Sequence, residues 1–218
     1  HNPTGAVFET AVLQRVIELA ERHDAIVVAD EVYEHLTFDV PHVPLATLPG
    51  GWERTLTISS AGKTFATTGW KIGWATGPAP LVTAVNTVKQ FLTYANGAPF
   101  QPAIATGLRL SDTFFAGIAE TLARKRDILG AGLRAAGFAV SEPRGSYFKV
   151  ADAAPLGVTD AADFCRELPA RAGVVGVPVS AFVTEERRAE YATLVRFAAC
   201  KRVEVLEDAA SRLATLAR

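Results

Sequence analysis

The sequence contains no methionine and only two cysteines in 218 residues. Cys165 and Cys200 form no ligand-spaced cluster and imply no disulfide framework, so we expect two buried, inert thiols. The chain opens on His-Asn-Pro-Thr-Gly, which has the composition of a turn rather than of an ordinary N-terminus. Together with the missing methionine, this opening predicts that the chain is the later part of a longer protein.

An excess of charge and a long apolar run are also missing. The chain has 22 basic and 23 acidic residues, which favours neither a nucleic-acid nor an anionic-membrane partner. No apolar run approaches the length that spans a bilayer, and no basic-then-apolar signal opens the chain. Since 49% of the residues are hydrophobic, a substantial core is possible. We therefore expect a soluble, cytoplasmic protein.

Strand and helix patterns alternate along the chain, which predicts an α/β fold. Helical spacing of apolar residues covers 8–23, 81–94, 99–110, 114–138, 161–172 and 203–216. Short apolar runs predict strands at 25–29, 55–58, 72–76, 139–141, 146–150, 174–179 and 194–200. The run at 25–29 has the composition of a strand covered on both faces. The pattern at 114–138 is long enough to leave one domain and enter the next, with a boundary near residue 120.

One lysine has an unusual setting. Lys63 follows the predicted strand at 55–58 and lies among small residues and hydroxyls. A charged lysine at a buried strand end is unfavourable, so its pKa falls and the neutral amine becomes a nucleophile toward carbonyls. Two alternatives remain: a solvated surface lysine, or a phosphate loop, because Gly-Lys-Thr ends such a motif. For that loop, Thr57 stands where the first glycine is required.

Other polar residues end or interrupt apolar strands. Asp30 and Tyr33 follow the run at 25–29, where open α/β sheets bind their ligands. Asp30 could instead cap a turn, and Tyr33 could simply be packed. Arg196 lies inside an apolar strand, so it either pairs with an internal carboxylate or binds an external one.

These groups together fit pyridoxal 5′-phosphate, which needs an acid, a phenol, a lysine that forms a Schiff base, a cation near a hydroxyl and a carboxylate-binding arginine. A nicotinamide dehydrogenase is the other candidate for an α/β chain. It lacks support, because no Gly-x-Gly-x-x-Gly follows a predicted strand.

Four motifs in order resemble the fold-type I, class I and II aminotransferases, which use pyridoxal phosphate. They are Asn2-Pro3-Thr4-Gly5, Asp30-Glu31-Val32-Tyr33, Ser60-Ala61-Gly62-Lys63 and Arg196. The resemblance covers essentially the whole chain. It implies a partial large cofactor-binding domain with a mixed, mostly parallel sheet at 1–120, followed by a smaller α+β domain at 121–218.

The resemblance also implies roles for the residues around the cofactor ring. Lys63 would form the Schiff base and then move the proton between substrate and cofactor. Asp30 would pair with the pyridine nitrogen, while Tyr33 and Asn2 would hydrogen-bond the phenolic oxygen.

Further roles concern the phosphate and the substrate. Ser60 and Lys71 would hold the phosphate, and Arg196 would bind the substrate α-carboxylate, with Asn2 also near the substrate. Many relatives carry arginine where Lys71 stands, and lysine grips phosphate less directionally.

Within the family, segment 69–74 resembles the branch of kynurenine and glutamine transaminases and N-succinyldiaminopimelate aminotransferases. Segments 31–36, 98–102 and 196–202 are most similar to the N-succinyldiaminopimelate enzymes of that branch. This resemblance implies transfer of an amino group between an amino acid and a 2-oxo acid, with glutamate and 2-oxoglutarate as one pair, in lysine biosynthesis. It also implies a homodimer, in which segment 94–100 is where residues would reach a neighbour.

Two other functions stay open. The same site could perform β-elimination on cysteine conjugates, or the chain could be a non-catalytic sensor domain of a transcription regulator. The N-terminal portion of the family, with its first phosphate-binding loop and ring-stacking aromatic, is missing from the sequence. We therefore expect this fragment alone to retain the cofactor weakly and to turn over little or no substrate. No metal site is expected.

Overall fold

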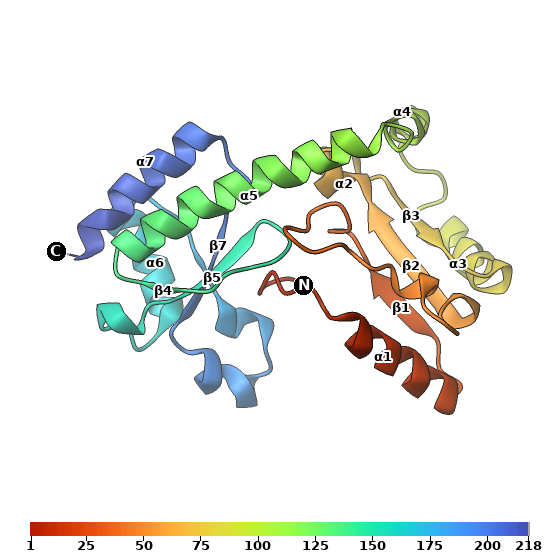
Figure 1. Cartoon of the computed structure of the whole chain (residues 1–218), viewed down its shortest axis with the longest axis horizontal. Helices are drawn as coiled ribbons and strands as arrows, with labels where there is room; N and C mark the ends of the chain where they lie inside the picture. Colours follow the sequence, from red (N-terminus) through yellow and green to blue (C-terminus); the bar gives the residue numbers. More distant parts are fainter. Residues whose placement is uncertain (218) are drawn as a thin grey trace. The chain divides into compact units, whose positions relative to one another are not determined.

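The computed structural model describes residues 1–217. They form two compact units (Figure 1). The N-terminal unit is Val7–Ile118, and the C-terminal unit joins His1–Ala6 to the chain from Ala119 onward. The division therefore falls inside helix α5, Asp112–Ala135. It differs from a simple cut near residue 120, because the first six residues belong to the C-terminal unit.

The N-terminal unit is built on a three-stranded sheet of order β1-β2-β3. Strand β1 (Val27–Asp30) pairs in parallel with β2 (Thr55–Ser60), and β3 (Gly73–Thr76) pairs antiparallel with β2. The sheet is therefore mixed, as predicted. The helices of this unit are α1 (Thr10–Arg22), α2 (Ala61–Thr64), α3 (Ala79–Leu92), α4 (Phe100–Gly107) and the beginning of α5.

One face of this sheet is open. Along β1, half-buried and exposed residues alternate, and Val28 is 61% exposed. On β2, Ile58 is 39% exposed. The prediction that the run at 25–29 is covered on both faces is therefore wrong for the described part of the chain. Residues 1–217 supply a covering layer for one face only, so the alternating side chains of the other face contact solvent.

The C-terminal unit contains an antiparallel sheet of order β4-β5-β7-β6. Its strands are β4 (Ala139–Val140), β5 (Phe148–Asp152), β6 (Val177–Pro178) and β7 (Leu194–Ala198), and its helices are α6 (Ala161–Ala172) and α7 (Val203–Leu213) together with most of α5. A core of apolar side chains forms between sheet and helices; it includes Leu129, Leu133, Phe138, Phe164, Leu168, Val195, Phe197 and Leu213.

Two expectations for this unit need correction. The strand predicted at 174–179 pairs only at Val177 and Pro178, and a proline cannot donate to a ladder. The thiols also differ from each other: Cys165 is buried, which raises its pKa to about 11, whereas Cys200 is exposed. In the part of the chain that the structure describes, no helix combines the length and apolar character needed to cross a membrane.

Candidate active site

Asp30 is the last residue of β1, and the chain turns away from the sheet directly after it. The backbone N–H of Glu31 donates to the carbonyl of Ile58 over 2.8 Å, which ties this turn to the neighbouring strand β2. The Asp30 side chain is exposed, and its Oδ1 accepts a hydrogen bond from the Val32 backbone N–H over 3.2 Å. Asp30 therefore does cap its own turn, as the alternative interpretation proposed. The cap engages Oδ1, and Asp30 still stands at the carboxyl end of a strand.

The turn that carries Tyr33 is anchored by two glutamates that sequence reasoning missed. Glu31 is only 8% exposed; its Oε1 accepts from the Leu45 N–H and its Oε2 lies against His42 Nε2, each over 2.9 Å. Glu34 Oε1 accepts from the hydroxyl of Ser59 over 2.6 Å. These contacts flank Tyr33, which is half-buried. The signal for them was the presence of two further acids close to Asp30 in the sequence Asp-Glu-Val-Tyr-Glu.

Lys63 lies in the short helix α2, not on a strand end as the sequence suggested. Ser60 begins this helix: its Oγ accepts from the Gly62 N–H over 3.2 Å and donates to the carbonyl of Ile72 over 3.3 Å. The residues on either side of Lys63 are buried, while Lys63 itself is half-buried. A turn of helix fixed at its beginning by Ser60 therefore sets the position of the lysine.

Lys71 reaches the same region through the backbone. The carbonyl of Ile72 accepts from both the Ala61 N–H over 3.0 Å and the Ser60 hydroxyl, so segment 71–72 runs beside the start of α2. Lys71 has a left-handed backbone, with φ of 55°, and its carbonyl accepts from Asn96 Nδ2 over 2.9 Å. Its side chain is exposed. The predicted phosphate-binding pair, Ser60 and Lys71, thus comes from two adjacent segments.

The glycines near these residues test whether a phosphate fits. A Cβ at Gly73 or Gly77 would lie 2.8 or 2.6 Å from a carbonyl of β2, so close strand packing explains both. A Cβ at Gly69 would have no heavy atom of the described residues within 4 Å, and its φ is not positive. Neither packing nor conformation accounts for Gly69. Gly69 is exposed, so the open space beside it is solvent, and it is the nearby Ser60 hydroxyl and Lys71 ammonium group that have the chemistry to bind an anionic phosphate.

Arg196 and Asn2 belong to the C-terminal unit. Along β7 the residues Val195 and Phe197 enter the core, so Arg196 faces the other side and is half-buried. Its Nη1 donates to Oδ1 of Asn2 over 2.7 Å. One partner of the arginine is therefore a neutral amide.

The seven predicted site residues thus divide between the units. Five lie in the N-terminal unit, at the ends of β1 and β2, in the segments that follow these strands, and just before β3: Asp30, Tyr33, Ser60, Lys63 and Lys71. Asn2 and Arg196 contact each other in the C-terminal unit.

Comparison with known proteins agrees with this chemistry. The family model for "Aminotransferase class I and II" matches residues 1–213. The chain is 47% identical to the "Probable N-succinyldiaminopimelate aminotransferase DapC" of Mycobacterium tuberculosis, over all of this chain and 56% of that protein. It is 37% identical to rat kynurenine–oxoglutarate transaminase 3, over 96% of this chain and 50% of that protein. The chain therefore spans about half the length of these curated relatives.

Solved structures lead to the same family. N-succinyldiaminopimelate aminotransferase from Mycobacterium tuberculosis superposes with a TM-score of 0.95 at 48% identity, over 99% of this chain and 56% of that one. YbdL from Escherichia coli, which has a methionine aminotransferase function, gives 0.92 at 31% identity over the same shares. The predicted fold-type I architecture is confirmed, and the cofactor of this family is pyridoxal phosphate. The chain belongs to the class I and II aminotransferases.

Proposed function

We propose that the protein is a pyridoxal phosphate-dependent aminotransferase that exchanges an amino group between an amino acid and a 2-oxo acid. The observation that carries the proposal is the pairing of β1 and β2, which are parallel and adjacent, so that Asp30 and Ser60 stand at neighbouring carboxyl ends and Lys63 follows in α2. Open α/β sheets bind their ligands at such ends. The acid, the hydroxyl and the amine that this cofactor requires are therefore gathered in one region.

Each residue would have a distinct task. Lys63 would hold the cofactor covalently and, as a free amine, would accept and return the α-proton of the substrate. The carboxylate of Asp30 would keep a proton on the ring nitrogen. When bound, the cofactor supplies an electron sink for the electron pair that remains after the α-proton leaves.

The other residues would bind and orient. Ser60 and Lys71 would hold the phosphate, and the hydroxyl of Tyr33 would donate to the phenolic oxygen. Arg196 would bind the substrate α-carboxylate through its guanidinium. Asn2 can accept from Arg196 through Oδ1 while its amide N–H groups donate to cofactor or substrate.

The finer substrate assignment rests on similarity. A relative that is 47% identical over the entire chain is named for N-succinyldiaminopimelate, so we propose this type of substrate, with glutamate and 2-oxoglutarate as one pair. The names of the kynurenine–oxoglutarate transaminases also contain the 2-oxo acid of that pair.

Assembly and location complete the proposal. At the end of α3, Phe91, Leu92 and Tyr94 are 81%, 77% and 82% exposed, and large apolar groups in water favour burial by a partner. We propose a second copy of the chain as that partner, in a homodimer. The exposed free thiol of Cys200 is compatible with the reducing cytoplasm.

The test is the visible absorbance spectrum after incubation with pyridoxal phosphate and gel filtration. The protein produced from its complete reading frame should retain a visible band that disappears in Lys63→Ala and persists in the control Lys201→Ala. Addition of glutamate should deplete the band and release 2-oxoglutarate. Absence of a band in wild type would refute the proposal. Release of pyruvate from a cysteine conjugate, without exchange with 2-oxoglutarate, would indicate a lyase instead.

A further inference from the structure

Two phenyl rings lie against the guanidinium group of Arg196. Its Cζ is 4.1 Å from the ring centroid of Phe148 and 4.5 Å from that of Phe182. Another cation–ring contact of this unit, that of Arg187 with Tyr191, is longer at 5.6 Å. Distances within about 6 Å give a favourable interaction between a cation and the ring face. Arg196 therefore has two such contacts as well as its hydrogen bond to Asn2.

The sheet register explains how both rings arrive there. In the ladder between β5 and β7, Val150 stands opposite Arg196, and Phe148 lies two residues before Val150, so it shares the face of Arg196 as a diagonal neighbour. On the other side of β7, Val177 of β6 stands opposite Arg196. The 3-10 turn Val179–Phe182 directly follows β6. One ring therefore comes from β5, and the other comes from the turn that follows β6.

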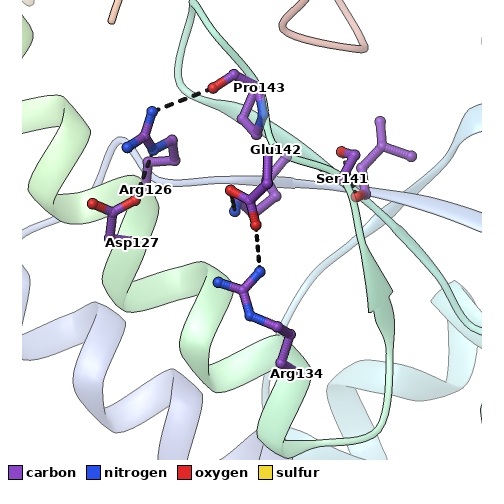
Figure 2. Close-up of polar contacts among 8 residues, drawn as sticks. Arg126, Asp127, Arg134, Ser141, Glu142 and Pro143 are labelled. Atoms are coloured by element: carbon purple, nitrogen blue, oxygen red, sulfur yellow. Dashed lines mark hydrogen bonds and ion pairs between the residues drawn. The ribbon is translucent and has the colours of Figure 1, made fainter. Parts of the chain in front are cut away.

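The segment that leads into Phe148 is itself held in place. Figure 2 shows Glu142 accepting from Arg134 of α5, and Arg126 of α5 donating to the carbonyl of Pro143 over 3.4 Å. Lys149, the residue after Phe148, is 1% exposed and donates to Glu142 over 3.1 Å. Helix α5 therefore fixes the loop between β4 and β5, and with it the beginning of β5.

A guanidinium binds a carboxylate best as a planar fork, and the long arginine side chain must lose rotamer freedom to present it. Rings packed against the group would restrict that freedom before the ligand arrives. We propose that Phe148 and Phe182 are positioning residues that hold Arg196 ready for the substrate α-carboxylate. This inference rests on the proposed role of Arg196. It adds two residues that determine how tightly Arg196 binds the carboxylate.

The experiment uses the protein produced from its complete reading frame and the probe glutarate, a dicarboxylate with no amino or oxo group to react. Calorimetry measures the affinity for glutarate, and steady-state kinetics measure KM and kcat for glutamate. The variants are Phe148→Leu, Phe182→Leu and Phe182→Tyr, with Tyr191→Leu as the matched control at a ring outside the site. Each substitution at Phe182 is also made together with Arg196→Lys.

Phe148→Leu and Phe182→Leu should each weaken glutarate binding and raise KM about tenfold, with kcat changed less than twofold. Phe182→Tyr keeps a ring and should behave like wild type, as should Tyr191→Leu. In the Arg196→Lys background, loss of the Phe182 ring should have no further effect. Phe182 is 42% exposed, so Phe182→Leu is expected to fold even where the buried Phe148→Leu does not.

Wild-type affinity for glutarate in Phe182→Leu would overturn the inference, as would an equal loss in the Arg196→Lys background. If Arg196→Lys itself leaves glutarate binding unchanged, Arg196 does not bind a carboxylate and the inference fails. If glutarate binding depends on Arg196 and both rings but glutamate is not transaminated, the proposed function fails while the positioning role stands.

Discussion

The side chain of Arg196 donates to that of Asn2 over 2.7 Å, although the two residues are 194 positions apart. The contact exists because the opening turn docks on the C-terminal unit. There the carbonyl of Gly5 accepts from the backbone N–H groups of Arg144 and Gly145 over 3.0 and 2.9 Å. A Cβ at Gly5 would lie 2.4 Å from Cβ of Pro143, so only glycine allows this approach. The proposed carboxylate-binding residues Asn2 and Arg196 therefore come from opposite ends of the sequence.

Asn2→Ala removes one hydrogen bond from Arg196 and should weaken glutarate binding about fivefold. Asn2→Asp should weaken it more, because an acid of the same shape would neutralise the guanidinium that the ligand needs. Thr4→Ala is the control, since the Thr4 hydroxyl contacts only His1 and the Ala6 N–H among the hydrogen bonds observed. If calorimetry shows that Asn2→Asp binds glutarate as tightly as wild type, or more tightly, this account is wrong.

Gly69→Ala separates cofactor binding from folding. Open space at this position means that the methyl group should leave the free energy of unfolding within about 0.5 kcal/mol of wild type. It should still reduce retention of pyridoxal phosphate after gel filtration, because it would occupy space beside the residues proposed to hold the phosphate. In Gly73→Ala, by contrast, Cβ would lie 2.8 Å from the Ser59 carbonyl, so that variant should unfold more easily. If Gly69→Ala retained the cofactor fully, the proposal that the phosphate binds beside Gly69 would be wrong.

Local patterns determined much of what could be predicted. Helix α6 begins and ends where the apolar spacing indicated, and Asp30 stood out as a candidate because an apolar run ends there. Pairings between distant segments could not be read in this way. Sheet register sets both the hydrogen bond from Ser59 to Glu34 and the position of the rings beside Arg196. A short stretch of sequence does not show this register, because the strands that pair are far apart in the chain. The helical setting of Lys63 was missed, because four residues are too few to show a period.

A third prediction concerns Thr55, the first residue of β2. Its side chain is fully buried, and its hydroxyl has no hydrogen-bond partner among the described residues. An unsatisfied buried hydroxyl is unfavourable, and valine has nearly the same shape. Thr55→Val should therefore raise the free energy of unfolding by about 1 kcal/mol in urea titrations. Thr57→Val, at a half-buried position of the same strand, should change it by less than about 0.5 kcal/mol. A loss of stability in Thr55→Val would mean that the hydroxyl is satisfied in solution.

The last prediction concerns the ion pair of Lys149 and Glu142. Burial lowers the pKa of Lys149, and the hydrogen bond to Glu142 partly offsets that effect. Burial acts to raise the pKa of Glu142, but hydrogen bonds from Lys149 and Arg134 outweigh it, so the pKa lies below its ordinary value. An acid with a lowered pKa stabilises the folded state at neutral pH. That stability is lost as pH falls through the folded pKa.

Glu142→Gln should therefore lower the free energy of unfolding at pH 7 by about 1 kcal/mol, because it leaves a buried ammonium group without its counter-charge while the acid itself is largely solvated. Lys149→Met should be at least as stable as wild type there, since it removes the buried charge and leaves Glu142 with Arg134. Urea titrations from pH 7 to pH 3 check both. The difference between wild type and Glu142→Gln should begin to shrink below the ordinary pKa of 4.5, where the carboxyl of the unfolded chain becomes neutral, and should disappear as pH falls through the lower folded pKa. A difference that stays constant down to pH 3 would show that the charge of Glu142 is not what stabilises the loop, because the other titrating groups are the same in the two proteins.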